Sequence, residues 1–206
     1  MWDRFSAAEM ERRFALARGL MEEEGLAALV LFGSSGVSRG NMANAFWLSN
    51  HLDLHHCYLV VPADPSLEAA LYTGLTNHVP NAREVSDVPV IGWGGYDPAD
   101  KVAARLRELG VTSGRAGLVG VNSKFSMGMP YAHHERLLAE LPGLELADVT
   151  ARFQRLRTVK SEEEIEWLRI GATLSDAGFI TNTSSAGQHS NRAPPCDIPK
   201  PSTCPG

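Results

Sequence analysis

The sequence predicts an α/β fold of three layers, in which helices cover both faces of one mixed sheet. Two observations support this prediction. After a first helix, apolar segments with short connections indicate an antiparallel meander, and the remainder of the chain alternates strand and helix patterns. The chain has 206 residues, of which 44% are hydrophobic, and this is enough to bury the core that such a fold needs.

The first helix is expected to begin after Ser6 and to end before Gly25. Ser6 and Glu9 have the spacing of a capping box, in which each side chain accepts from the other residue's backbone N–H. Gly25 stands where a left-handed residue terminates a helix. Apolar side chains recur on one helical face at Met10, Phe14, Ala17 and Met21.

The meander is expected to contain four strands. Leu26–Phe32 is an uninterrupted apolar run, typical of a strand buried on both faces, and the Gly-Ser-Ser-Gly turn of residues 33–36 ends it. A weaker strand is predicted over Ala45–Leu48. Cys57–Val61 and Leu67–Tyr72 are two further strands, and the short connection between them predicts an antiparallel pair.

The second half alternates helices and strands. Asp97 and Pro98 have the residue types that start a helix, and Ser161 with Glu164 forms a second capping box that opens the last helix. The expected elements are a short helix over Thr76–Glu84, strands over Val88–Ile91, Ala116–Val121 and Leu144–Ala147, and helices after Asp97, Pro130 and Ser161.

The composition excludes several function classes. A net charge of −5 without a basic block argues against nucleic acid or an anionic membrane as a partner. The N-terminus lacks the features of a signal peptide, and no apolar run is long enough to span a membrane, so we expect a cytoplasmic protein. The three cysteines, Cys57, Cys196 and Cys204, are too few for a disulfide framework.

A composition change near residue 179 divides the chain. Residues 1–157 carry the predicted α/β domain, and residues 158–178 form a junction helix. Residues 179–206 contain five of the twelve prolines and few large apolar side chains, so ordering them would gain little burial. We expect this last segment to be a disordered and non-native tail.

Three motifs suggest chemistry but are incomplete. The glycine turn at residues 33–36 follows a strand, as a phosphate loop would, but it matches no nucleotide-binding pattern and is better explained as a turn. His51, His55, His56 and Cys57 are grouped potential metal ligands, but neighbouring side chains in an extended segment point apart, which favours a polar loop. The sequence His133-His134-Glu135 is only half of a zincin motif.

Asp53 and Trp93 have no clear structural assignment. Asp53 is not explained as a turn or cap residue, but a single carboxylate is not a site. Trp93 lies among Gly92, Gly94 and Gly95, which would let its ring form a contact surface or fold back over the sheet edge. No complete catalytic set can be read from the chain.

The segment from Phe153 to Ile165 resembles a known family junction. Its sequence closely resembles the pattern Leu-Arg-x-(Val/Ile)-Lys-Ser-x-x-Glu-(Ile/Leu) of creatinase, prolidase and aminopeptidase P-like proteins. Phe46–Asn50 is similar to the family's Tyr-Leu-Thr-Gly segment, with Asn50 in place of the glycine. The predicted strands follow the family's order, so the resemblance covers about residues 5–178.

The resemblance implies an N-terminal domain with a ribonuclease-H-like arrangement, followed by a pita-bread catalytic domain. In metal-dependent members, two Asp, one His and two Glu of the second domain bind two divalent ions (Mn, Co or Zn) for Xaa-Pro hydrolysis, whereas creatinase-like members use no metal. Because the chain leaves the family pattern at Phe179, none of these ligands is expected here. We therefore expect no catalytic residue, no bound metal and no cofactor in this chain, and no activity of the chain alone.

The resemblance also implies partners. N-terminal domains of the family help to form homodimers and wall the active site of the other subunit, so a peptide or small-molecule substrate is expected for the parent protein. His51, Asp53, His55 and Trp93 are the candidate substrate or subunit contacts. The alternative is a free-standing small-molecule or dimerisation module without hydrolase activity.

Overall fold

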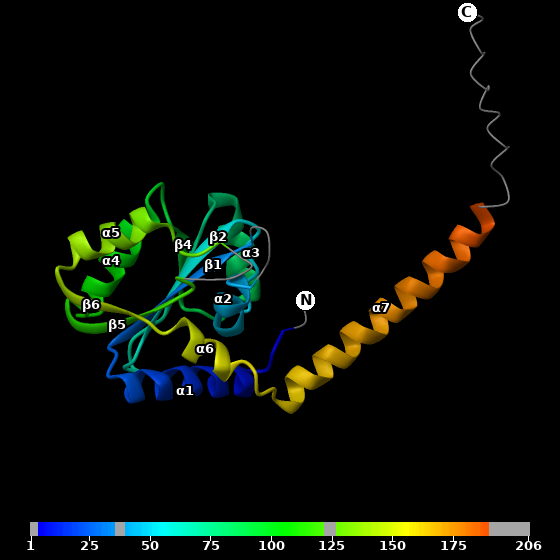
Figure 1. Cartoon of the computed structure of the whole chain (residues 1–206), viewed down its shortest axis with the longest axis horizontal. Helices are drawn as coiled ribbons and strands as arrows, with labels where there is room; N and C mark the ends of the chain where they lie inside the picture. Colours follow the sequence, from blue (N-terminus) through cyan, green and yellow to red (C-terminus); the bar gives the residue numbers. More distant parts are fainter. Residues whose placement is uncertain (1–3, 36–39, 122–126, 190–206) are drawn as a thin grey trace, which may run out of the picture. The chain divides into compact units, whose positions relative to one another are not determined.

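The computed structural model describes residues 4–35, 40–121 and 127–189, with side chains described through Gly178. The chain divides into two compact units, residues 1–159 and residues 160–206 (Figure 1). The first unit contains all of the described sheet. None of the described helices is both long and apolar enough to cross a membrane.

A mixed sheet organises the first unit. Its strands follow the order β4-β3-β2-β1-β5-β6, in which β2 runs antiparallel to β1 and β3 and the other neighbouring pairs are parallel. The predicted mixed sheet is therefore confirmed, and three of the four strands expected in the meander form it. The strands are β1 (Ala28–Ser34), β2 (His56–Pro62), β3 (Ala70–Thr73), β4 (Val90–Trp93), β5 (Ser113–Val119) and β6 (Gly143–Asp148).

Helices cover both faces of this sheet, which confirms the three layers. Helices α4 and α5 pack on one face, and α1, α2, α3 and α6 pack on the other (Figure 1). The helices are α1 (Ala7–Glu24), α2 (Met42–Ser49), α3 (Val79–Val85) after a short 3-10 turn η1 (Thr76–His78), α4 (Pro98–Glu108), α5 (Tyr131–Glu140) and α6 (Thr150–Leu156).

Strand β1 lies at the centre of the core, and every residue in it is buried. Val30 and Phe32 belong to the apolar cluster under α4 and α5, whereas Leu29 and Leu31 belong to the cluster under α1 and α2. Because both faces of the strand are covered, its sequence is apolar from Ala28 to Phe32 instead of alternating with polar residues.

A buried ion pair fixes α1 against α2. The Glu9 carboxylate accepts a hydrogen bond of 2.7 Å from the Arg13 guanidinium, and both side chains are almost fully buried. Arg13 also donates to the carbonyl oxygen of Trp47, at 3.0 Å, and stacks over the Phe5 ring. Breaking such a pair on one side would leave an uncompensated buried charge, so it fixes the orientation of α1.

Helix ends agree closely with the capping signals. Ser6 Oγ accepts from the backbone N–H of Glu9 at 3.1 Å, and Gly25 adopts the left-handed conformation with φ 62°. Asp97 Oδ1 accepts from the backbone N–H of Ala99 at 3.2 Å at the start of α4. These caps are local interactions, which explains why residue spacing alone predicts them.

Two elements differ from the sequence prediction. Ala45–Leu48 was expected to be a strand but lies in α2, because a four-residue apolar run does not distinguish a buried strand from a buried helix. The helix ends at Asn50, which takes the left-handed conformation (φ 54°) that asparagine tolerates better than most residues. Helix α6 was not predicted; Asp148 Oδ1 accepts from the backbone N–H of Thr150 at its start.

The second unit contains helix α7 (Glu162–His189). Its capping box is reciprocal: Ser161 Oγ accepts from the Glu164 N–H and Glu164 Oε2 accepts from the Ser161 N–H, each at 3.1 Å. The helix includes residues 179–189, which were expected to be disordered, and no proline interrupts the sequence there. Residues 190–206 of the expected tail, including Cys196 and Cys204, lie outside the described residues.

Gly120, directly after β5, provides a test of backbone packing. It has φ 93°, and a Cβ atom there would overlap the carbonyl oxygen of Phe32. We expect Gly120→Ala to lower the free energy of unfolding by about 3 kcal/mol, because strain and overlap add. Urea denaturation measures this, with Gly92→Ala as the control, since a Cβ at Gly92 meets nothing within 4 Å. Equal effects of the two substitutions would contradict the prediction.

Candidate functional site

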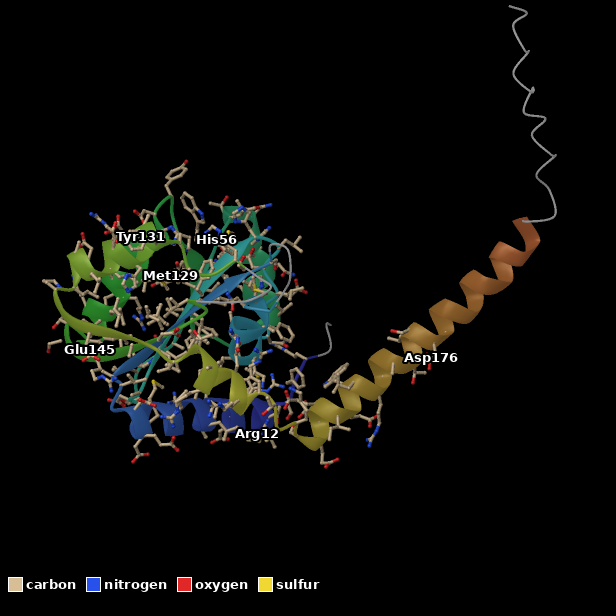
Figure 2. All side chains as sticks on the ribbon, in the orientation of Figure 1. Arg12, His56, Met129, Tyr131, Glu145 and Asp176 are labelled. Atoms are coloured by element: carbon tan, nitrogen blue, oxygen red, sulfur yellow. The ribbon has the colours of Figure 1, made fainter. Side chains whose placement is uncertain are left out.

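The loops at one edge of the sheet contain the candidate residues. Strands β1, β3, β4 and β5 all end at this edge, because they run in the same direction. Ligands of open α/β sheets bind outside the carboxyl ends of such strands. Figure 2 shows His56 and Tyr131 at this end of the first unit, away from Arg12 on α1. We call this side of the unit the loop edge.

Asp53 connects three segments at the loop edge. Its Oδ1 accepts from the backbone N–H of His55 at 2.8 Å and from Nδ1 of His78 at 2.9 Å. Its Oδ2 accepts from the backbone N–H of Gly74 at 3.3 Å and lies 3.5 Å from Nε2 of His51. The carboxylate therefore joins its own loop to the turn after β3 and to η1.

The surroundings of Asp53 favour its ionised form. Burial on its own raises the pKa of this carboxyl group, but the adjacent His51 ring and the hydrogen bonds from the His55 backbone and the His78 ring outweigh burial. The net result is a pKa below the ordinary value of 3.8. Asp53 is thus a buried carboxylate with an acceptor role, which suits positioning of the loop better than proton transfer.

The four predicted contact residues differ in exposure. His51 and Asp53 are buried, whereas His55 is exposed and Trp93 is half-buried. Asp53 brings His51 and His55 together, but Trp93 comes from β4 and joins a separate group of aromatic side chains. Only His55 and Trp93 of these four residues are exposed enough to touch a substrate or a second subunit directly, and such a contact stays a prediction.

A hollow of about 300 Å³ opens beside Trp93. The Trp93 indole donates to the carbonyl oxygen of Gly74 at 3.3 Å, which holds the ring against the turn after β3. The Tyr96 ring packs edge-on against it, with 5.1 Å between the ring centroids, and is 99% exposed. The remaining lining residues are His56, Leu75, Thr76, Gly95, Pro98 and His133.

Two histidines form part of the lining. Burial lowers the pKa of His56, and the neighbouring His55 lowers it further. Burial also lowers the pKa of His133, whose Nδ1 lies 2.8 Å from the hydroxyl of Tyr58. Both rings are therefore neutral near neutral pH, and the hollow presents imidazole and aromatic surface instead of a charged group.

Large apolar side chains are exposed on segments of the loop edge, and two of them, Leu75 and Tyr96, line the hollow. An exposed patch of this kind on one side of a protein typically marks a contact surface. Its members are Leu52 (38% exposed), Leu54 (72%), Leu75 (41%), Tyr96 (99%), Met127 (58%) and Tyr131 (73%). We call these six residues the apolar rim.

Sequence reasoning missed most of this arrangement. Thr76 lies in η1, Tyr96 between β4 and α4, and His133 in α5, and only the sheet topology brings these segments together. The exposed Tyr96, three residues after Trp93, is a signal that could have been found. His133 was noted only as part of a zincin-like fragment, and its pairing with Tyr58 on β2 is not visible from spacing.

The other sequence motifs have structural explanations or lie outside the description. A Cβ at Gly33 would crowd Cys57 Sγ at 2.9 Å, so this glycine permits close packing of β1 against β2. Gly36 of the predicted turn lies outside the described residues. Burial raises the pKa of the Cys57 thiol. Within the described part of the chain, no group of three or more His, Cys, Asp or Glu side chains is placed to hold a metal ion.

Comparison with known protein families identifies the family of this chain. Residues 13–159 match the Creatinase/Prolidase N-terminal domain. The chain belongs to this family. A comparison with curated proteins finds no match.

Solved structures of peptidases share the fold. The chain superposes on an Xaa-Pro dipeptidase from Bacillus anthracis with a TM-score of 0.63 and 18% identity, covering 85% of this chain and 43% of that one. An X-Pro aminopeptidase from Thermotoga maritima gives a TM-score of 0.62 and 16% identity, covering 81% and 43%. An aminopeptidase from Streptococcus pyogenes gives 0.54 and 18%, covering 73% and 99%. The chain thus spans less than half of the first two proteins.

The hydrogen bonds to Asp53 predict a pH dependence of stability. Since the folded pKa lies below 3.8, ionised Asp53 stabilises the folded chain fully above 3.8 and loses this effect as the pH falls through the folded pKa. We expect Asp53→Asn to cost about 2 kcal/mol near neutral pH, and less in acid. Thermal unfolding of both proteins between about pH 6 and about pH 3 measures the difference. A difference that is constant with pH would contradict this role.

Proposed function

We propose that this chain is the N-terminal, non-catalytic part of an Xaa-Pro peptidase- or creatinase-like hydrolase. The observation that carries the proposal is the family match over residues 13–159. Solved Xaa-Pro peptidases add support, because the chain covers 43% of two of them and leaves room for a second domain. Peptide hydrolysis by the parent and a cytoplasmic location belong to the same proposal.

The proposal assigns the chemistry of hydrolysis to a separate catalytic domain of the parent protein. The described residues do not fit a two-metal centre, because they contain no cluster of three or more potential ligands. The Asp53 carboxylate already interacts with four neighbouring groups of the chain. In this proposal, any pair of divalent ions (Mn, Co or Zn) is bound by the catalytic domain of the parent, and no step of hydrolysis is derived from residues 1–178.

The loop edge is proposed to contact a second subunit and to wall its active site. The apolar rim supports this role, because it exposes large side chains that a partner would cover. Asp53 fixes the loop that includes Leu52 and Leu54, so these two rim residues are presented by a rigid support.

A free-standing binding or dimerisation module is the second candidate. The hollow beside Trp93 favours it, because about 300 Å³ lined by aromatic and imidazole rings is enough for a small ligand. Sequencing the gene beyond codon 178 and translating all three frames separates the two. A frame that continues with two Asp, one His and two Glu in family order supports the hydrolase, and no such frame supports the module.

We expect the purified chain to release no proline from Xaa-Pro dipeptides. The reason is that no described cluster of side chains can activate water through a metal ion. Proline release is measured with Mn²⁺, Co²⁺ or Zn²⁺ added, and a catalytically competent prolidase is the positive control. Turnover that increases in proportion to the concentration of purified chain would contradict the prediction.

Tyr96 gives a second prediction, for the parent protein. Tyr96→Ala removes a ring that is 99% exposed, so the fold should remain intact. We expect the substitution to weaken the dimer or raise KM by about tenfold, because it removes about 1–2 kcal/mol of contact. Leu67→Ala is the matched control, since Leu67 is partly exposed on the connection between β2 and β3, away from the loop edge. Unchanged mass and unchanged kinetics would contradict the role of the loop edge.

A further inference from the structure

The hollow beside Trp93 contains a hydrogen-bonded pair that determines which atoms it offers to a ligand. The hydroxyl of Tyr58 lies 2.8 Å from Nδ1 of His133. Tyr58 comes from β2 and its side chain is fully buried, whereas His133 comes from α5 and lines the hollow. The pair therefore connects the core of the sheet to the lining of the hollow.

Burial decides the direction of this hydrogen bond. Burial raises the pKa of the Tyr58 phenol, so the hydroxyl keeps its proton, and burial lowers the pKa of His133, so the imidazole is neutral. A neutral imidazole has one nitrogen that donates and one that accepts. If Nδ1 donated to Tyr58, the buried hydroxyl hydrogen would lose its acceptor, which costs free energy. The hydroxyl therefore donates to Nδ1, and the proton of His133 is on Nε2.

The Nε2–H group of His133 is thus the ring donor that can meet a ligand. Nδ1 faces Tyr58, so the rest of the imidazole ring is the part that lines the hollow. Tyr58 is a positioning residue, because it fixes the tautomer of His133 from the core. A ligand with an acceptor atom would satisfy this N–H group inside the hollow.

The rest of the lining favours a flat and uncharged ligand. The rings of Trp93 and Tyr96 meet at 80° with 5.1 Å between their centroids, so they form a corner against which another ring can pack. None of the nine described residues that line the hollow is an aspartate, glutamate, lysine or arginine. A charged ligand would therefore be buried there without a counter-charge, which is costly. The volume of about 300 Å³ is at the lower end for ligand pockets, which suits a single ring.

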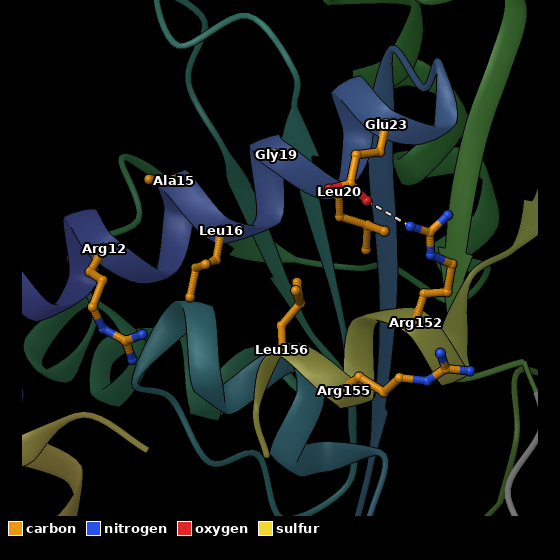
Figure 3. A pocket seen from close by; sticks show the side chains of 9 residues that line it. All are labelled: Arg12, Ala15, Leu16, Gly19, Leu20, Glu23, Arg152, Arg155 and Leu156. Carbon is orange, nitrogen blue, oxygen red and sulfur yellow. Dashed lines mark hydrogen bonds and ion pairs between the residues drawn. The ribbon is translucent and has the colours of Figure 1, made fainter. Parts of the chain in front are cut away.

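The groove between α1 and α6 has a different character (Figure 3). It measures about 490 Å³, with Arg12 at one end and Arg152 and Arg155 toward the other. Arg152 already pairs with both Glu23 and Glu24 of the same chain. The nine described residues of this lining are arginine, glutamate, leucine, alanine or glycine, without an aromatic ring. The groove is therefore a suitable comparison site when ligand binding to the hollow is tested.

We propose that the hollow beside Trp93 binds a small, planar and uncharged carbonyl compound, such as an aromatic amide. Its ring packs in the corner of Trp93 and Tyr96, and its carbonyl oxygen accepts from Nε2–H of His133. The proposal rests on the second candidate function for its site, the hollow, and names the class of ligand. Sequencing of the gene decides whether a catalytic domain follows, so failure of that candidate function does not change the outcome of a binding test on the purified chain.

The tautomer of His133 is tested by ¹⁵N NMR of the full chain labelled at histidine. We expect the shift of an unprotonated nitrogen for Nδ1 and of a protonated nitrogen for Nε2. The His133 signals are those absent from the double variant Tyr58→Phe/His133→Phe, which replaces both partners so that no buried hydroxyl loses its acceptor. A protonated Nδ1 would overturn the proposal.

Ligand class is tested with two probes, benzamide and benzylamine. Benzylamine has the same ring, but it carries a positive charge at neutral pH and has no carbonyl oxygen. The indole N–H signal of Trp93, assigned from Trp93→Phe, measures dissociation constants up to about 10 mM. We expect benzamide to bind at least about tenfold more tightly than benzylamine. Equal binding of the two probes, or no binding of benzamide, would contradict the proposed class.

Three variants locate the contact. We expect Tyr96→Ala and the double variant Tyr58→Phe/His133→Phe each to weaken benzamide binding about tenfold, because one loses a ring contact and the other a hydrogen bond. Gly19→Gln is the control, since a Cβ at Gly19 meets nothing within 4 Å and the longer side chain fills the groove between α1 and α6. It should leave benzamide binding unchanged. Binding that is lost in Gly19→Gln but kept in the other two variants would assign benzamide to the groove and overturn the proposal.

Discussion

A buried carboxylate at Asp53 is the constraint on which the loop edge depends. Desolvating a charge is costly, so its oxygens must be hydrogen-bonded wherever the chain places them. Here the donors come from the backbone of His55 and Gly74 and from the ring of His78, which belong to three different segments. Satisfying one charge therefore fixes the loop before β2, the turn after β3 and η1 together.

This constraint extends indirectly to the aromatic hollow. Gly74 donates its N–H to Asp53 and accepts from the Trp93 indole through its carbonyl oxygen. The same residue thus joins the polar network to the ring that lines the hollow. Tyr96, which packs against Trp93, is held by this chain of contacts although it is almost fully exposed.

The parts of the fold that sequence predicts are those set by local interactions or by continuous burial. The caps at Ser6, Asp97 and Ser161 each depend on residues within three positions, and all three are present. Strand β1 was predictable because burial on both faces leaves an unbroken apolar run. The same reasoning failed for Ala45–Leu48, since α2 is also buried and equally apolar over four residues.

The candidate site was less predictable, because its geometry depends on distant segments. Asp53 had no assignment in the sequence, since its partner His78 is twenty-five residues away and its role requires the β2–β3 pairing to form first. The pairing of Tyr58 with His133 joins β2 to α5 across the sheet. The family resemblance predicted substrate or subunit contacts at residues of the loop edge, but it did not identify the hollow beside Trp93.

The loop edge is the proposed contact surface of the first unit. The loop edge presents rings and apolar side chains on a rigid polar support.

The position of β1 has a consequence for synthesis of the chain on the ribosome. Strand β2 can pair with β1 soon after it emerges, and β3 and β4 then add beyond β2. The other neighbour of β1 is β5, which is made much later, because Ala28 pairs with Ala116. Until then, one side of this largely apolar strand has unpaired backbone groups. Such an edge is a template for pairing with other nascent chains, so crowded polysomes are where this protein is most exposed to aggregation.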